Sequence, residues 1–179
     1  MQKLSQKNYS RIGILGGTFD PPHKGHLHIS KIAIKKLKLD KIIWIVTKKN
    51  PLKHKPYLSI KERINLSKKI TKKNKKIFVQ FLDNKIKSNN TFNLLKYIKL
   101  KKKSTELFFL IGADNLIKFH KWKKWKKIPK FAKIVVFARQ NYYSKALNSI
   151  AAKKLKLTDW TYINSKKVNI SSSLIKKFW

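Results

Sequence analysis

The chain has 179 residues, of which 42% are hydrophobic and 12% aromatic, so it is long enough for one domain with a buried core and short for two. It contains no cysteine, which excludes a disulfide framework, a thiol nucleophile and a thiolate metal site. Its 45 basic residues outnumber seven acidic ones and give a formal net charge of +38. We therefore expect a single domain over residues 1–179, in which residues 1–10 form a flexible N-terminal extension.

The apolar runs indicate where the protein resides. All of them are much shorter than the roughly 20 residues that a membrane-spanning helix needs. The first ten residues are polar, so no secretory signal is expected. We predict a cytoplasmic protein that does not associate with a membrane.

The positive charge has two interpretations. Of the basic residues, 42 are lysine and only three are arginine, whereas nucleic-acid-binding proteins often use arginine and gather their charge on one face. Here the lysines are spread over almost every segment. The excess of Lys, Ile and Asn over Arg, Ala and Gly is typical of an AT-rich genome. Specific nucleic acid is therefore not an expected partner, although nonspecific binding of polyanions is.

Short β-branched runs alternate with longer amphipathic stretches along the chain. The predicted strands are, in chain order, Arg11–Leu15, Lys41–Val46, Ile77–Leu82, Leu107–Ile111, Lys133–Phe137 and a weaker sixth at Trp160–Ile163. Helical apolar faces lie between them, and one or two further helices are predicted between Ala113 and Ile128. This alternation predicts an α/β fold with a Rossmann-like, doubly wound parallel sheet of five to six strands. Ligands bind such sheets beyond the carboxyl ends of the strands, so functional residues should follow the strands.

The first strand is followed by the string G-G-T-F-D-P-P-H-K-G-H-L over residues 16–27. Its glycine spacing fits neither the dinucleotide-binding fingerprint nor a Walker A loop. The two glycines allow a ligand to approach the backbone closely, and a helix opening at Gly25-His26 would offer free N–H groups to a phosphate. His23 and His26 are three residues apart, so both can face one pocket and donate hydrogen bonds to a phosphoryl group. A tight turn with two incidental histidines is the plainer alternative.

This string resembles the G-T-F-D-P-x-H-x-G-H signature of the nucleotidylyltransferase superfamily, and the resemblance extends over residues 11–177. It implies the nucleotidylyltransferase type of fold. It also implies that His23 and His26 are catalytic. The residues that it implies at the ATP phosphates are Gly16, Gly17, Thr18 and Phe19.

A second segment resembles the nicotinate mononucleotide adenylyltransferase family. It reads I-G-A-D-N-L over residues 111–116 and F-H-K-W-K-K-W over residues 119–125. The resemblance implies that Trp122 stacks on the pyridine ring, for which a flat indole is suited, and that Gly112 and Asp114 contact a ribose. On its spacing alone, the pair Trp122 and Trp125 fits a helix packed in the core equally well.

Three shorter stretches add candidates. N-P-L-K over residues 50–53 resembles the family's phosphate-side loop, which implies that Lys53 reaches towards ATP. N-T-F-N-L-L over residues 90–95 resembles the Y-T-x-D-T-L segment that presents backbone N–H groups to the nicotinate carboxylate, and so implies a role for Thr91. Arg139 matches an arginine that follows the fifth strand in this family.

The C-terminal string N-I-S-S-S-L-I-K-K over residues 169–177 resembles the family pattern I-S-S-T-x-I-R, a helix start that holds the ATP phosphates. The implied phosphate-binding residues are Ser171, Ser172, Ser173 and Lys176. Lysine at 176 keeps the charge of the family's arginine but lacks its bidentate fork. The same ending also resembles pantetheine-phosphate adenylyltransferases, which share the fold but lack the G-x-D-x-L…W segment.

The predicted function is transfer of the adenylyl group of ATP to nicotinate mononucleotide, giving deamido-NAD and pyrophosphate in NAD biosynthesis. The expected partners are ATP and nicotinate mononucleotide, with Mg²⁺ held by the ATP phosphates and no metal ligand from the protein. Two alternatives stay open. One is a pantetheine-phosphate adenylyltransferase, and the other is a basic nucleic-acid-binding protein on a degenerate transferase fold. The sequence also leaves open the preference for nicotinate over nicotinamide, and the oligomeric state.

Overall fold

A computed structural model describes residues 10–50, 55–164 and 172–176. Six strands form a single sheet: β1 (Ser10–Gly17), β2 (Lys41–Val46), β3 (Ile77–Gln80), β4 (Thr105–Gly112), β5 (Lys133–Phe137) and β6 (Trp160–Ile163). All six predicted strands are therefore present. The third is shorter than expected, because it ends at Gln80 and the apolar residues after it leave the sheet. Of the predicted N-terminal extension, residues 1–9 lie outside the described ranges, and Ser10 already belongs to β1.

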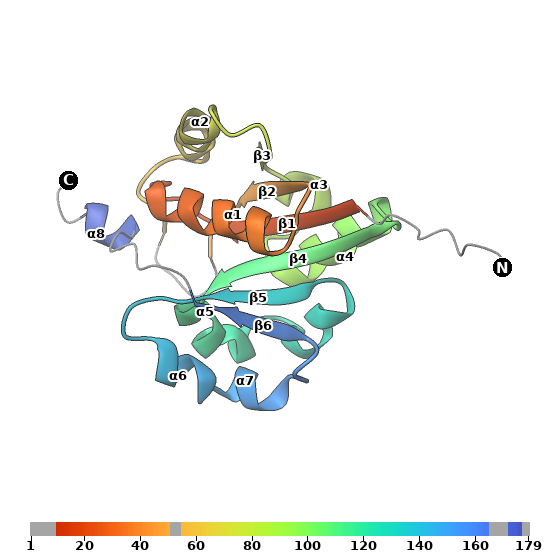
Figure 1. The fold of residues 1–179 in the computed structure, drawn as a ribbon. Coiled ribbons are helices and arrows are strands. Elements are labelled where there is room, and N and C mark those ends of the chain that lie inside the picture. Colours follow the sequence, from red (N-terminus) through yellow and green to blue (C-terminus); the bar gives the residue numbers. More distant parts are fainter. Residues whose placement is uncertain (1–9, 51–54, 165–171, 177–179) are drawn as a thin grey trace.

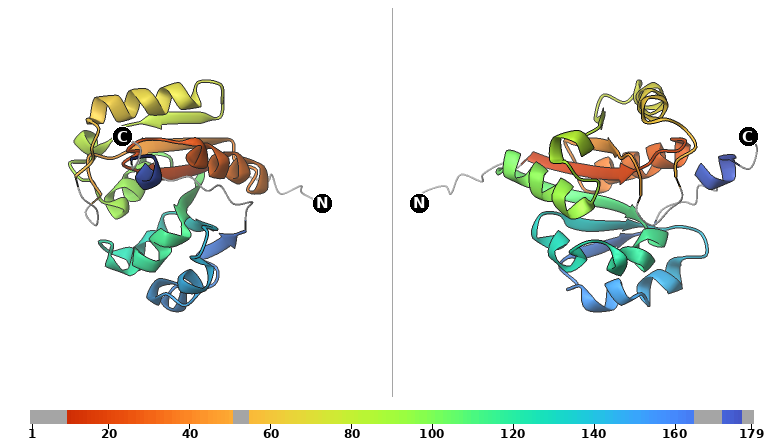
Figure 2. Two further views of the ribbon diagram at one scale, coloured as in Figure 1. Left: turned by 90° about the vertical axis from the view of Figure 1, so that its left-hand side faces the viewer. Right: turned by 180° about the vertical axis from the view of Figure 1, so that it is seen from behind.

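The sheet is entirely parallel, in the order β3-β2-β1-β4-β5-β6, and helices cover both of its faces (Figures 1 and 2). The helices are α1 (Lys24–Lys36), α2 (Ile60–Thr71), α3 (Asp83–Ile86), α4 (Thr91–Lys101), α5 (Ala113–Lys118), α6 (Tyr143–Leu147), α7 (Ile150–Lys154) and α8 (Ser172–Lys176), with short 3₁₀ turns at Phe119–Lys121 and Trp125–Lys130. No helix within the described ranges is both long and apolar enough to cross a membrane. The predicted doubly wound α/β fold is confirmed.

Two hydrophobic clusters hold the layers together, one on each face of the sheet. One packs α1 and α2 against the sheet, and the other packs α4, α5, α6 and α7 against it. Alternate residues of each strand supply the two clusters, as in β2, where Ile43 and Ile45 face one side and Ile42 and Trp44 the other. Burial on both faces explains why the strands are continuous apolar runs rather than alternating ones.

The position in the sheet at which the order of strand addition reverses determines where a ligand can bind. From β1 the chain proceeds through β2 to β3, and then crosses to β4 on the other side of β1. The connections that leave β1 and β4 therefore run to opposite faces, and they open a crevice beyond the carboxyl ends of these strands. Gly16 and Gly17 end β1, and Gly112 ends β4, so the predicted glycines lie at this crevice.

Candidate active site

Two histidines cap the helix that follows β1. His23 is the N-cap of α1, and its Nδ1 accepts a hydrogen bond from the Gly25 N–H at 3.1 Å. The Nδ1 of His26 accepts in turn from the His23 N–H at 3.2 Å, and the two ring centroids are 3.8 Å apart. Because each Nδ1 is an acceptor, each neutral ring carries its proton on Nε2. The cap therefore fixes both tautomers and makes each Nε2–H a donor.

This cap corrects one expectation about the helix start. The helix begins at Lys24 rather than at Gly25-His26, and the Gly25 N–H that was expected to bind phosphate is already bonded to His23. An N-cap side chain normally satisfies one of the helix's first donors in this way. The N–H of Gly25 is therefore engaged in the cap, and the imidazole Nε2–H groups are further donors that belong to this loop.

An aromatic pair supports His26 from behind. The Phe19 ring stacks on Trp44, with 4.9 Å between centroids and 13° between planes, and lies 4.8 Å from His26. Trp44 Nε1 donates to Ser30 Oγ at 2.9 Å, and Ser30 Oγ donates to the His26 carbonyl at 2.8 Å. These contacts tie the first turn of α1 to β2. Because Phe19 is only 2% exposed, its ring supports His26 rather than offering a surface to a ligand.

The surroundings of His23 keep its ring neutral. Burial lowers the pKa of His23 to about 4, and the positive charge of Arg139 acts in the same direction. Arg139 itself pairs with Asp114, with 2.7 Å between Nη1 and Oδ2. An added Cβ at Gly112 would lie 2.5 Å from Oδ1 of the same Asp114, so a larger residue there would require this carboxylate to move. Gly112 and Asp114, which were predicted at the ribose, thus form one cluster with Arg139 at the ends of β4 and β5.

The guanidinium of Arg63, in α2, lies at the centre of the loops around the crevice. Nη1 donates to the carbonyls of Thr18 and Thr47, both at 2.7 Å, and Nη2 donates to that of Lys48 at 3.2 Å. Nε donates to the Leu58 carbonyl at 3.0 Å. The residue is 2% exposed, and burial lowers its pKa while the nearby carboxylates of the loops oppose that shift.

Asp20 complements this arginine from the β1–α1 loop. Its carboxylate accepts from the N–H groups of Tyr57 and Leu58, both at 2.9 Å, and from Lys176 Nζ at 3.1 Å. Burial would raise the pKa of Asp20, but the two N–H donors and Lys176 outweigh it and lower the pKa. Ser172 Oγ donates to the Pro21 carbonyl at 2.8 Å. The C-terminal helix α8 is therefore attached to the histidine loop by its first and last residues.

Beside this loop the crevice deepens into a pocket of about 460 Å³. It is lined by Gly16, Gly17, Ile45, Thr47, Lys49, Asn50, Asp83, Ile86, Asn89, Asn90, Thr91, Leu94, Phe109, Lys121, Trp122 and Lys123. Its volume is within the range of small-molecule sites, and a mainly apolar wall with a few polar groups is typical of them. Four predicted residues, two glycines from β1 together with Thr91 and Trp122, are brought together in it.

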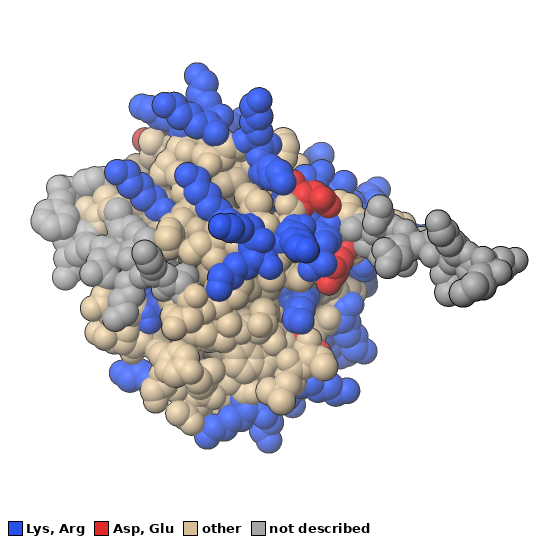
Figure 3. Space-filling model, viewed as in Figure 1, with Lys and Arg blue, Asp and Glu red and all other residues tan. Residues whose placement is uncertain are grey.

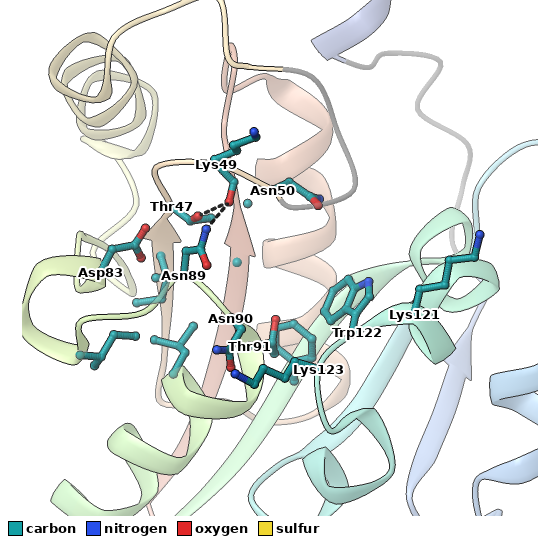
Figure 4. A pocket seen from close by; sticks show the side chains of 16 residues that line it. Thr47, Lys49, Asn50, Asp83, Asn89, Asn90, Thr91, Lys121, Trp122 and Lys123 are labelled. Atoms are coloured by element: carbon teal, nitrogen blue, oxygen red, sulfur yellow. Dashed lines mark hydrogen bonds between the residues drawn. The ribbon is translucent and has the colours of Figure 1, made fainter.

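Trp122 forms the aromatic wall of this pocket (Figure 4). Its ring contacts Phe109 and Phe119, with centroids 6.0 and 5.0 Å away, so it is braced on its core side and half-buried. Thr91 is the first residue of α4, and Asn90 caps that helix by accepting from the Asn93 N–H at 2.9 Å. In Figure 4, Lys123 extends towards Asn90, whereas Lys121 extends away from the labelled cluster.

The remaining predicted residues fall outside these clusters. Lys53 and Ser171 lie outside the described residues, as does the side chain of Ser173. Lys176 contacts Asp20, and the Thr18 carbonyl accepts from Arg63; the ATP-phosphate contacts of both residues stay predictions.

Sequence reasoning missed several residues of the site, chiefly Arg63, Asp20 and Asp83. Arg63 is one of only three arginines, and that rarity was a usable signal. Asp83 is buried, accepts from the Lys48 N–H at 2.8 Å and lines the pocket. Burial raises the pKa of Asp83, against the opposing effect of its hydrogen bonds from residues 47 and 48.

Comparison with known proteins identifies this arrangement. Residues 14–178 match the cytidylyltransferase-like family model. A protein of Pelagibacter ubique named "Probable nicotinate-nucleotide adenylyltransferase" is 51% identical over 97% of this chain and 96% of its own length. A protein of the same name from a Bradyrhizobium species is 34% identical over 91% of this chain and 93% of its own length. The chain belongs to the nicotinate-nucleotide adenylyltransferase family.

Solved structures agree on the fold. The nicotinic acid mononucleotide adenylyltransferase of Plasmodium falciparum complexed with NaAD matches 95% of this chain and 84% of its own, with a TM-score of 0.77 and 22% identity. The same enzyme complexed with APC gives a TM-score of 0.76. The predicted family and fold are confirmed, and the chain is a nucleotidyltransferase.

The environment of His23 predicts an unusual titration. We expect the His23 ring to titrate with a midpoint near pH 4, measured by ¹³Cε1–¹Hε1 NMR. R139Q should raise that midpoint modestly, because it removes a positive charge but leaves the larger effect of burial in place. A wild-type midpoint near the ordinary value of about 6.5 would contradict the described burial of this ring.

The contacts of Arg63 predict a large loss of stability on its replacement. R63M should lower the free energy of unfolding by about 3–5 kcal/mol, because it leaves buried carbonyls without a donor. R11Q is the matched control: Arg11 faces Glu106 at 3.5 Å with both side chains more than a third exposed, so its loss should cost less than about 1 kcal/mol. Urea unfolding measures both, and equal costs would refute the central role of Arg63.

Proposed function

We propose that the chain transfers the adenylyl group of ATP to nicotinate mononucleotide, releasing pyrophosphate and forming nicotinate adenine dinucleotide for NAD synthesis. The observation that carries the proposal is the pocket with Trp122 and Thr91 beside a loop that presents two imidazole donors. Family membership supports it, because the relatives are named for this activity. We also propose a cytoplasmic location, where ATP is supplied.

The pocket fits the acceptor nucleotide. The braced indole of Trp122 offers a flat surface to a pyridine ring, and the N-terminus of α4 at Thr91 offers main-chain donors to a negatively charged substituent. Lys123 adds a positive charge at the same rim. A carboxylate would gain from both, whereas a neutral amide would gain little from the charge. We therefore propose that nicotinate is preferred to nicotinamide.

The chemistry requires positioning rather than a strong base. The 5′-phosphate of the acceptor is already anionic, and one of its oxygens attacks the α-phosphorus of ATP in line. A new P–O bond forms while the bond from the α-phosphorus to the bridging oxygen breaks, and that oxygen leaves with pyrophosphate. No proton is transferred and no covalent enzyme intermediate forms. The protein's contribution is orientation and donors for the charge that develops.

His23 and His26 are the proposed catalytic residues. The cap directs both Nδ1 atoms to the backbone, so the donor of each neutral ring is its Nε2–H, which we propose to meet a phosphoryl oxygen. Because the pKa of His23 is about 4, this ring acts as a neutral donor at physiological pH and does not depend on protonation. Gly16 and Gly17 let the substrates approach β1. Lys53 and the serines of the C-terminal string are proposed at the ATP phosphates.

ATP-dependent transfer of this kind generally uses a divalent metal, and we propose Mg²⁺. This cation prefers oxygen ligands and usually binds through substrate phosphates with one or two carboxylates. Within the described ranges no group of three or more His, Cys, Asp or Glu could hold a metal, and Asp20 in the loop is already bonded to two N–H groups and Lys176. The ATP phosphates would hold the ion, and it would neutralise part of their charge.

Substrate preference tests the proposal. Pyrophosphate release from Mg-ATP is measured with nicotinate mononucleotide, nicotinamide mononucleotide and phosphopantetheine offered separately. We expect the highest kcat/KM with the first, because only its ring carries a carboxylate that Lys123 and the start of α4 can bind. A preference for phosphopantetheine would refute the proposed acceptor and return Trp122 to a purely structural role.

The catalytic assignment has its own test. H26A should lower kcat by about 10²–10³ through loss of a preorganised donor, with a much smaller change in the KM for the mononucleotide. H26Q can still accept from the His23 N–H, as glutamine does in a capping box, so it separates loss of catalysis from loss of the cap and should also be slow. K31Q, at an exposed position of the same helix, is the control and should retain full turnover. Unchanged turnover in H26A would show that His26 is not catalytic.

A further inference from the structure

All seven acidic side chains of the protein have local partners. Three of them form ion pairs with a lysine or an arginine side chain, and the other four accept hydrogen bonds from main-chain N–H groups. The partners are Lys176 for Asp20, Arg11 N–H for Asp40, Ser59 N–H for Glu62, Lys48 N–H for Asp83, Arg11 for Glu106, Arg139 for Asp114 and Lys156 N–H for Asp159. Among the described lysines, Lys176 alone lies within 4 Å of a carboxylate. The lysine charge is therefore left for ligands and counterions to neutralise.

Most of these lysines are dispersed, but one group surrounds a groove. On the face drawn in Figure 3, lysines crowd over α1 and α2 and are sparse over β5 and β6. On the other face of the sheet, a groove of about 490 Å³ lies between α4 and the strands β2 and β3. Its lining includes four lysines, Lys41, Lys85, Lys101 and Lys102, and no acidic residue. It shares no lining residue with the active-site pocket.

The floor of this groove is aromatic. Phe78 lies on β3, which is an edge strand of the sheet, and is 48% exposed. Phe81 and Tyr97 are half-buried beside it in the same lining. The ammonium of Lys41 is 5.9 Å from the centroid of the Phe78 ring. An exposed phenyl ring with ammonium groups around it offers a stacking surface and charge in one place.

These features match the chemistry of a nucleotide chain. A base can stack on an exposed aromatic ring whatever its identity, and lysines can contact the phosphates on either side of it. A base paired within a duplex keeps its faces stacked on its neighbours, so this floor favours an unpaired strand. We propose that the groove between α4 and β3 binds single-stranded nucleic acid, with a base on Phe78 and its phosphates among the four lysines.

Binding of a fluorescein-labelled ten-residue oligouridylate, followed by fluorescence anisotropy, tests the aromatic part. F78A should weaken binding about tenfold, because stacking on one aromatic ring is lost, and F78W should retain it. Inorganic polyphosphate of matched charge should bind F78A and the wild type alike. If F78A binds the oligouridylate as the wild type does, the groove is not the binding site.

Matched triple variants test the lysines. K85Q/K101Q/K102Q should weaken binding and reduce the slope of log affinity against log salt by about two, at roughly 0.7 for each single-strand phosphate contact. K31Q/K35Q/K36Q removes three exposed lysines from α1, on the opposite face, and should change both quantities much less. Equal losses in the two variants would mean that dispersed charge alone binds the strand, which would overturn the proposal.

Two further measurements complete the test. Adenylyl transfer should be unchanged in F78A and in both triple variants, because the groove and the active-site pocket share no residue; loss of transfer in F78A or K85Q/K101Q/K102Q but not in K31Q/K35Q/K36Q would overturn a binding site separate from the active site. AMP should compete only weakly with the oligouridylate. Competition by AMP as strong as that of the oligouridylate itself would assign the groove to free nucleotides and overturn the assignment to a strand.

Discussion

Four main-chain carbonyls from the loops around the crevice converge on the guanidinium of Arg63, and no other described side chain bonds to so many separate segments. Loop backbones cannot bond to one another as strands do, so their carbonyls need a donor with several directions. A buried guanidinium offers five donors in a rigid plane. This one group fixes the positions of the histidine loop, the end of β2 and the start of α2 relative to one another.

The carboxylate of Asp20 completes the arrangement around Arg63. Leu58 donates its N–H to Asp20 and offers its carbonyl to Arg63, so one peptide segment is fixed from both sides. Asp20 also receives Lys176 from α8. The loop with the two histidines therefore rests on the charged pair of Arg63 and Asp20, which contacts no substrate in the proposed mechanism. A substitution in this pair would alter catalysis through geometry rather than chemistry.

Sequence patterns predicted those parts whose signal is local. The strands were recognisable because burial on both faces requires unbroken apolar runs such as Lys41–Val46, and the histidine string because its chemistry lies within twelve residues. The helices α6 and α7 have five residues each, too few for a helical period to show. Arg63 could not be assigned a role from spacing, since its partners are up to 45 residues away in the chain. Its rarity among 42 lysines was the one available clue, because lysine replaces arginine freely except where a planar fork is needed.

The full engagement of the acidic residues has a consequence for the molecule in solution. With its seven carboxylates committed to local partners, the protein has none left to balance its lysines, and its neutralising charge must come from the surrounding salt. The counterions around the protein thus contribute to the stability of its folded state. Diluting the salt strengthens the repulsion between lysines throughout the chain and weakens the compact form. Each phosphate that enters a crevice or groove displaces counterions already gathered there, so association with anionic ligands is driven in part by the entropy of released ions.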